Sequence, residues 1–262
     1  MVTSWPADTV RAVTVLVTAL TQIAAGPVTL LLLLGPGSDQ ATISDANRSP
    51  VTPAGYAFAI WGLIYLAALG LALYQLLPGQ RSREVHRRTG WWLVAAFTAS
   101  TLWVPVFSTR TIWLSQLVIV GLVVSLSIAA VRLTRLGPAL DGGERMLLRL
   151  PITFYLGWAT LATAAGFGAT FRSLGMPERG WVTAAASLLL VFVAALVSIG
   201  FVARLSASAG YLVSAVWALV AVAVETYVGP VRIAALLTAL LLLALAVRRT
   251  STSRRPITAL LG

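Results

Sequence analysis

The sequence predicts an all-α fold, a polytopic bundle of about eight transmembrane helices. Hydrophobic residues make up 58% of the 262 residues and charged residues only 10%. The mean hydropathy of +0.89 is far above that of a soluble domain. Apolar runs of roughly 20 residues recur along the whole chain, and polar segments with arginines separate them. This composition indicates an integral membrane protein.

Eight apolar runs are long enough to cross a bilayer. They lie at about 10–34, 54–77, 91–108, 112–133, 147–169, 181–203, 207–227 and 230–247. The first run could instead be a signal peptide, but it is too long for one, and Leu34-Gly35-Pro36 offers no small-residue cleavage pattern. We expect a five-helix core over residues 1–171 and a three-helix extension with a basic tail over residues 172–262.

The arginines predict the orientation of the chain, which contains no lysine. Most arginines fall on one side of the predicted spans. The other side receives only Arg48, Arg110, Arg172, Arg179 and Arg232. By the positive-inside rule, both termini are cytoplasmic in a protein of the plasma membrane. The formal charge of +11 is explained by topology and anionic lipid, so nucleic acid is not expected as a partner.

The sequence argues against an enzyme. There is no cysteine, and the spans contain no paired carboxylates and no serine with a candidate base. His86, the only histidine, lies among Arg83, Glu84 and Arg87 and is expected in a solvated loop, as are Asp141 and Glu144. A metal site would need partners that the sequence lacks. We therefore expect no catalytic residue, no metal and no cofactor.

Aromatic residues recur on one face of the second predicted span. Phe58, Trp61 and Tyr65 are spaced i, i+3 and i+7, which places them within an arc of about 60° on a helix. Leucine and valine face lipid equally well, whereas tryptophan and tyrosine carry a polar atom that needs a partner. The stripe therefore favours an interior position.

Two further spans repeat this feature. Trp103 and Phe107 are four residues apart, with Pro105 between them to kink the helix. Tyr155 and Trp158 follow Pro151 at helical spacing. Ordinary bundle packing is the alternative interpretation, but three stripes, each with a proline, favour a shared cavity. The predicted ligand-binding residues are Phe58, Trp61, Tyr65, Trp103, Phe107, Tyr155 and Trp158.

These motifs resemble the translocator protein or tryptophan-rich sensory protein family, TspO/MBR, and in particular its longer bacterial relatives. The likeness covers roughly residues 50–168. Its clearest element is a proline followed by Phe-x-x-Trp-x-x-x-Tyr and a small residue, met here by Pro53, Phe58, Trp61, Tyr65 and Gly70. The Trp-x-Pro-x-Phe at residues 103–107 and the Pro-x-x-x-Tyr-x-x-Trp at residues 151–158 support it.

The resemblance implies a five-helix bundle with an aromatic cavity that opens toward the first loop. Family members typically carry asparagines where this chain has Ser100 and Gly166, and Arg48 stands in for a lysine of the first loop. The implied ligands are porphyrins or other tetrapyrroles, sterols and drug-like molecules. Besides membrane lipid, a second copy of the chain is a possible partner, which would form a homodimer.

A flat conjugated ring would stack on tryptophan and tyrosine faces, while its carboxylates would need arginines at the membrane surface. Arg48, Arg110 and Arg172 lie on the predicted outer side and are the candidates for this pairing. The alternative is that each arginine snorkels at the end of a span.

The second functional hypothesis is a secondary transporter for a small amphipathic substrate that uses all eight spans. Kinks at Pro27, Pro105 and Pro151 would allow alternating access. Glu225 is the only acidic residue within a predicted span and is the candidate coupling group. Its position near the outer end of that span favours an interfacial ion pair with Arg232 instead.

Overall fold

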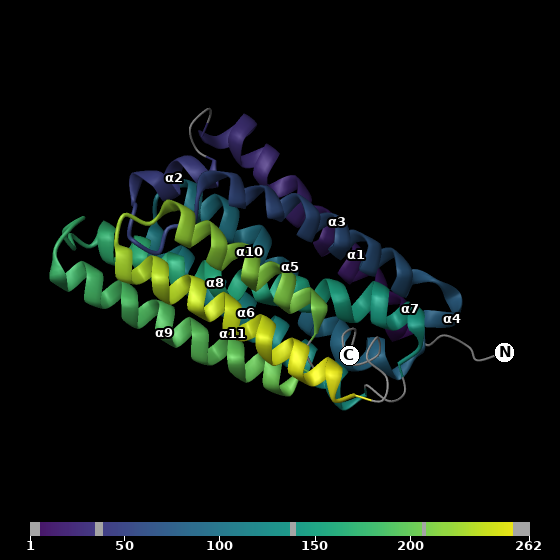
Figure 1. Cartoon of the computed structure of the whole chain (residues 1–262). Helices are drawn as coiled ribbons and strands as arrows, with labels where there is room; N and C mark the ends of the chain where they lie inside the picture. Colours follow the sequence, from purple (N-terminus) through teal and green to yellow (C-terminus); the bar gives the residue numbers. More distant parts are fainter. Residues whose placement is uncertain (1–5, 35–38, 137–139, 206–207, 254–262) are drawn as a thin grey trace.

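The computed structural model describes residues 6–34, 39–136, 140–205 and 208–253, which are helical and contain no strand (Figure 1). The long helices are α1 (Pro6–Val28), α3 (Ile60–Leu76), α5 (Glu84–Ser108), α6 (Ile112–Arg135), α8 (Leu150–Ser173), α9 (Trp181–Arg204), α10 (Ala209–Glu225) and α11 (Gly229–Ser251). The short segments are η1 (Thr29–Leu34), α2 (Gln40–Ala46), η2 (Gly55–Ala59), α4 (Pro78–Arg81), α7 (Gly142–Glu144) and η4 (Arg145–Arg149).

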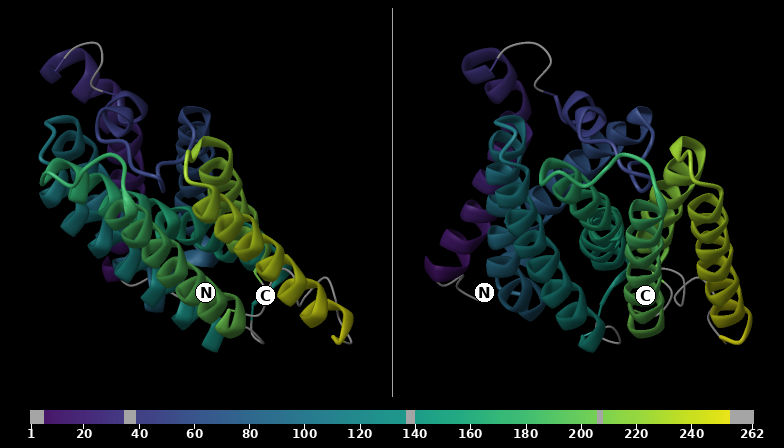
Figure 2. Two further views of the ribbon diagram at one scale, coloured as in Figure 1. Left: turned by 60° about the vertical axis from the view of Figure 1, so that its left-hand side comes forward. Right: turned by 90° about the vertical axis from the view of Figure 1, so that its left-hand side faces the viewer.

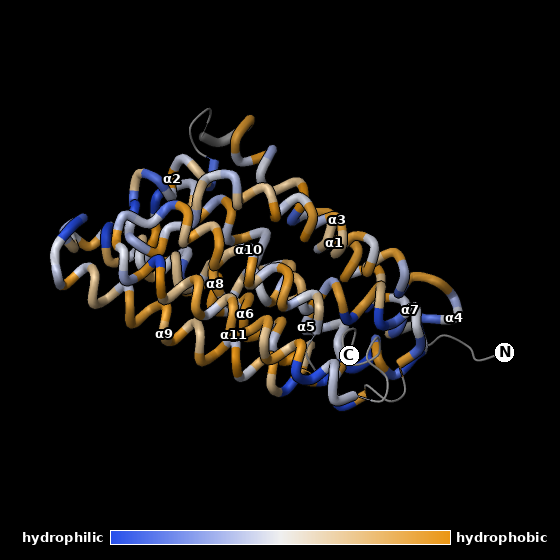
Figure 3. Tube along the Cα trace, viewed as in Figure 1, coloured by the Kyte–Doolittle hydropathy of each residue, from blue (hydrophilic) through white to orange (hydrophobic). Residues whose placement is uncertain are grey.

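The predicted membrane spans are confirmed. In the described residues, seven helical stretches are long and apolar enough to cross a bilayer. The remaining predicted span, at 207–227, is α10, whose 17 residues make an apolar helix of about 26 Å at 1.5 Å per residue. Figure 3 shows hydrophobic residues along the helices and hydrophilic residues gathered at the two ends of the bundle. The chain is a multi-pass membrane protein.

Helix α8 forms the centre of the bundle. It packs against α3 and α6 of the first half and against α9 and α10 of the second (Figure 2). In the most apolar stretch of this span, 56% of the residues are buried inside the bundle. The corresponding share for α1 is 22%, and α1 lies on the outside of the bundle against α3 and α5. The last three helices therefore pack onto the first five through α8, while the division of the chain at residue 171 stays a prediction.

Small residues let α8 and α10 approach closely. A Cβ built on Gly157 would lie 2.5 Å from the backbone oxygen of Tyr211, and one on Gly210 would lie 2.4 Å from that of Leu150. Backbone atoms cannot move aside as a flexible side chain can. Gly210 and Ser214 of α10 therefore form part of an internal packing surface against α8.

Replacing Gly157 by alanine is expected to destabilise the protein by about 1–3 kcal/mol, because the added methyl group overpacks the contact with α10. The measurement is the thermal unfolding midpoint of the detergent-purified protein. Gly121→Ala on α6 is the matched control, since no atom lies within 4 Å of its Cβ position. Equal midpoints for the two variants would contradict the close approach of α8 and α10.

Two residues expected in solvated loops are buried instead. Helix α5 begins at Glu84, earlier than the predicted start at residue 91, so His86 lies on a helix. It is fully buried, with its ring 5.9 Å from that of Tyr74. Glu144 is also fully buried and forms an ion pair with Arg83. Both predictions were wrong because sequence neighbours of a helical residue can face solvent while the residue itself faces the bundle.

Candidate functional site

The seven predicted aromatic residues come together in one cluster. Phe58 lies on η2, Trp61 and Tyr65 on α3, Trp103 and Phe107 on α5, and Tyr155 and Trp158 on α8. Three separate stripes thus face the same interior space, because α3, α5 and α8 each turn their aromatic face inward.

Trp61 is the central ring of this aromatic cluster. Its centroid lies 5.4 Å from that of Trp103, in a stacked arrangement, and 6.0 Å from that of Trp158, edge to face. It also contacts Tyr65 at 5.6 Å and Tyr155 at 5.9 Å. These separations fall in the range of favourable aromatic pairs. Trp61 therefore links the rings of α3, α5 and α8.

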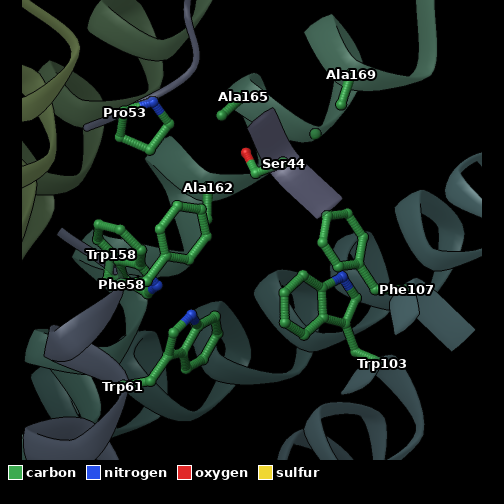
Figure 4. A pocket seen from close by; sticks show the side chains of 11 residues that line it. Ser44, Pro53, Phe58, Trp61, Trp103, Phe107, Trp158, Ala162, Ala165 and Ala169 are labelled. Atoms are coloured by element: carbon green, nitrogen blue, oxygen red, sulfur yellow. The ribbon is translucent and has the colours of Figure 1, made fainter. Parts of the chain in front are cut away.

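A cavity of about 40 Å³ lies within the cluster (Figure 4). Five of the seven aromatic residues line it, together with small residues of α8 and two residues of the first loop, Ser44 and Pro53. Tyr65 and Tyr155 do not line it. Figure 4 shows Phe58 and Trp61 facing Trp103 and Phe107 across the space. The volume suffices for a water molecule, whereas sites for drug-sized ligands measure about 300–1,000 Å³.

The first loop covers the cavity. Asp39 caps α2 by accepting hydrogen bonds from the backbone and side chain of Thr42, and these bonds hold the pKa of Asp39 below its ordinary value. Ser44 on α2 is one of the lining residues. Further along, a Cβ on Gly168 would meet Ser49 at 2.3 Å, so glycine lets the loop lie against α8. Movement of this lid, residues 40–53, would open the cavity toward the end of the bundle.

Two buried donors lie at the cavity wall. In the described part of the chain, the indole nitrogens of Trp61 and Trp158 have no hydrogen-bond partner. Leaving such a buried group unpaired costs about 1–3 kcal/mol. A ligand with acceptor groups could satisfy both indole N–H groups.

A polar cluster lies next to the rings, within the membrane. The hydroxyl group of Tyr155 donates to Oε1 of Gln22 at 3.3 Å, and the hydroxyls of Tyr65 and Ser100 are 3.4 Å apart. Gln22 and Ser100 are fully buried. Sequence reasoning missed Gln22, although a single amide in an apolar span is a signal, since such groups bond between helices.

A second amide stands beside the cavity at the position of an expected asparagine. A Cβ on Gly166 would lie 2.2 Å from Oε1 of Gln116, which comes from α6 and donates through Nε2 to the carbonyl of Thr163. The absence of a side chain at residue 166 thus makes room for an amide from a neighbouring helix.

Introducing asparagine at residue 166 is expected to destabilise the protein by about 0.5–1.5 kcal/mol, because its side chain would displace the amide of Gln116 and break the hydrogen bond to the Thr163 carbonyl. Adding Gln116→Ala should restore most of the unfolding midpoint. A double-mutant cycle on thermal unfolding measures this coupling. Additive effects of the two changes would show that the residues do not compete for the same space.

The outer arginines are only partly brought together. Arg48 forms an ion pair with Glu225 at the end of α10, and Arg172 donates through Nε to the Arg48 carbonyl at 3.0 Å. In the described residues, Arg110 makes no hydrogen bond or ion pair with either. It lies on the α5–α6 turn with a φ of 61°. Any carboxylate of a ligand would thus meet Arg172 and an Arg48 that already has an acidic partner.

Glu225 forms the expected interfacial ion pair, but the predicted partner was wrong. Arg232 donates instead to the carbonyls of Ala223 at 3.0 Å and Thr226 at 2.8 Å. These carbonyls belong to the end of α10, where cationic side chains stabilise the helix terminus. Arg232 is therefore occupied, and Glu225 is left to the loop residue Arg48.

Comparison with known proteins gives one match. A family model described as TSPO-like protein matches residues 11–248. The match extends from α1 into α11 and so includes the last three helices as well as the first five. No curated protein and no solved structure matches the chain.

Proposed function

Because the chain belongs to the TSPO-like protein family and is a multi-pass membrane protein of that type, we propose that its aromatic cavity binds a hydrophobic planar ligand. The ligand class is a porphyrin or other tetrapyrrole, or a sterol-like molecule. The protein acts as a receptor or sensor for it. The site binds and orients the ligand and performs no catalytic step.

The observation that carries this proposal is the convergence of seven rings from η2, α3, α5 and α8 in one cluster, five of which line a common cavity. Rings facing each other across a gap suit the insertion of a flat conjugated molecule, which stacks on aromatic faces. The small residues Ala162, Ala165 and Ala169 of α8 also line the cavity, and their short side chains leave room for a flat ligand once the lid opens. The unpaired indole N–H groups of Trp61 and Trp158 supply two donors.

The same geometry makes ligand entry a conformational step. The cavity of about 40 Å³ is far smaller than a tetrapyrrole site, so binding selects a form in which the lid has moved away. Arg172 donates a hydrogen bond to the carbonyl of the lid residue Arg48 and therefore lies beside the lid. There its guanidinium group pairs with a propionate group of the ligand at the outer surface.

The test is a titration of the purified full chain with protoporphyrin, followed by tryptophan fluorescence. Saturable quenching at one ligand per chain is the expected result, because the ring would lie against at least two of the nine tryptophans. A branched, non-planar amphiphile of similar hydrophobicity serves as the control and should not compete. Quenching that never saturates, or that the control displaces equally, would contradict a built site.

An alternating-access transporter is the second candidate. It is favoured by π-helical segments beside two of the predicted kink prolines, η1 just after Pro27 and η4 just before Pro151. Such irregular turns mark places where a span can bend. Against it, Glu225 pairs with a loop arginine at the surface. Substrate flux into vesicles that Glu225→Gln abolishes would favour transport, whereas binding without flux in both proteins would favour the receptor.

We also propose that the arginine-rich end of the bundle, with both termini, faces the cytoplasm of a cell whose plasma membrane holds the protein. The ends of α6 and α11 carry Arg132, Arg135, Arg248 and Arg249, as the positive-inside rule requires. Since the chain lacks cysteine, single cysteines placed at Ser82 and Arg110 can be labelled with a membrane-impermeant maleimide. Labelling of Arg110→Cys alone in intact cells is the expected result.

A further inference from the structure

A second space, separate from the aromatic cavity, opens on the membrane-facing side of the bundle. It is an apolar groove of about 770 Å³ between α3 and α10. Its walls are Ile60 and Leu63 on one side and Val213, Val216 and Val220 on the other. No residue lines both the groove and the aromatic cavity.

Backbone contacts close the groove at the end where the lid lies. The N–H of Ala54 donates to the carbonyl of Ala221 at 3.1 Å, and the Trp217 indole donates to the carbonyl of Ala57 at 3.2 Å. Tyr56 adds an edge-to-face contact with Trp217 at 5.5 Å. The segment around η2 is thus fastened to α10, and below it α3 and α10 separate.

The lining selects a hydrocarbon as the occupant. Every lining residue is apolar, and the one polar side-chain atom among them, the Trp217 indole nitrogen, already donates to Ala57. A flat ligand with carboxylates or carbonyls would find no partner there. Because the groove lies between membrane spans, the medium beside it is lipid, and an empty space would forfeit dispersion contacts along its walls.

The size of the groove suits an acyl chain. A flexible acyl chain can lie inside it along its length. One turn of a helix 10 Å across and 5.4 Å long occupies roughly 400 Å³, so a spanning helix of about 20 residues could place only one face there.

Positive charge near the open end of the groove indicates that the lipid headgroup is anionic. The groove extends to Phe154 of α8 and Leu243 of α11, toward the helix ends that carry Arg145, Arg248 and Arg249. The described residues of α9, α10 and α11 contain one acidic residue, Glu225, and it lies at the opposite end. Asp141 and Glu144 lie next to Arg145, but both are paired with Arg83. Basic segments at the ends of spans attract anionic lipid headgroups.

We propose that the groove between α3 and α10 binds an anionic phospholipid, with an acyl chain along α10 and the phosphate near Arg145 of η4 and near Arg248 and Arg249 at the end of α11. This site differs in place and in ligand chemistry from the aromatic cavity. Its occupancy does not depend on the function proposed for that cavity.

The test uses phosphatidylglycerol that carries a diazirine in its acyl chain, with phosphatidylcholine bearing the same chain as the comparison. The purified full chain is irradiated with each probe, and labelled peptides are mapped by mass spectrometry. Phosphatidylglycerol should label α3 and α10 at least fivefold more than the lipid-facing surface of α9, and phosphatidylcholine should label them several-fold less.

Two variants fill the groove from opposite walls, so the result does not depend on one of them folding. Val216→Trp and Leu63→Trp should each lower labelling at least fivefold, whereas Leu189→Trp, at an exposed position of α9, should not. Arg248→Gln with Arg249→Gln should reduce phosphatidylglycerol labelling to the level of phosphatidylcholine. Protoporphyrin binding should be unchanged in Val216→Trp.

Three outcomes would overturn the proposal. The first is equal labelling of α9 and the groove. The second is labelling that neither filling variant lowers. The third is a disulfide-linked dimer of Leu63→Cys that excludes the probe, which would assign this face to a second copy of the chain. The chain has no native cysteine to confuse that last measurement.

Discussion

Replacing Trp61 and Trp158 together by leucine is expected to weaken protoporphyrin binding by roughly 10- to 100-fold. Each ring contributes about 0.5–1.5 kcal/mol through stacking geometry beyond its buried area, so the two rings together contribute about 1–3 kcal/mol. Each tenfold loss in affinity corresponds to about 1.4 kcal/mol. Trp61 contacts four other aromatic rings, so its loss removes the surface that holds the cluster together. Trp158 contacts Trp61 edge to face and carries the second indole N–H group that has no hydrogen-bond partner.

Binding in this variant is best followed through the absorbance of the porphyrin after equilibrium dialysis, because removing tryptophans changes the fluorescence signal itself. The matched control is Trp113→Leu with Trp181→Leu, two exposed tryptophans on spans α6 and α9. It removes the same number of rings and should bind as the parent does. Parent-like affinity in the Trp61 and Trp158 variant would remove the aromatic cavity as the site.

Locking the lid shut is expected to lower the apparent affinity by roughly 100-fold, because only the open form can admit a ligand and affinity scales with the fraction of that form. The variant carries Ser44→Cys on α2 and Ala165→Cys on α8. Both residues line the cavity, Ser44 from the lid and Ala165 from α8 (Figure 4). Oxidation should join them, and dithiothreitol should restore binding in the same sample.

The absence of native cysteine makes the lock interpretable. Each single-cysteine variant under the same oxidant should bind as the parent does, and the mass of the intact protein reports whether the bond has formed. If the fully oxidised pair bound protoporphyrin normally, ligand entry past α2 would be refuted. The cavity would then have to be reached from another side.

Local patterns in the sequence were sufficient for the spans and the aromatic stripes. Apolar length determines a membrane span almost alone, since backbone groups in lipid must bond within one helix. The i, i+3, i+7 spacing of Phe58, Trp61 and Tyr65 fixes a common face whatever the neighbours are. The spacing of aromatic residues on α5 and α8 defines one face on each of those helices in the same way. The cluster therefore follows from the aromatic spacing within three separate helices.

What the sequence could not supply were contacts between distant segments. Glu225 was assigned to the nearby Arg232, but Arg48, far away in the chain, is its partner. Gln116 takes the space beside Gly166 because α6 lies against α8, and no pattern on either helix predicts that. His86 is buried because α5 begins earlier than its apolar run. Each case depends on which helices become neighbours.

The ties between the first loop and α10 connect the opening of the proposed site to the last three helices. Arg48 pairs with Glu225, while Ala54 donates a hydrogen bond to the same helix and Ala57 accepts one from it. Because apparent affinity scales with the fraction of the open form, weakening these ties should both speed ligand entry and raise the apparent affinity. The last three helices would thus regulate access to rings that lie mostly on the first five.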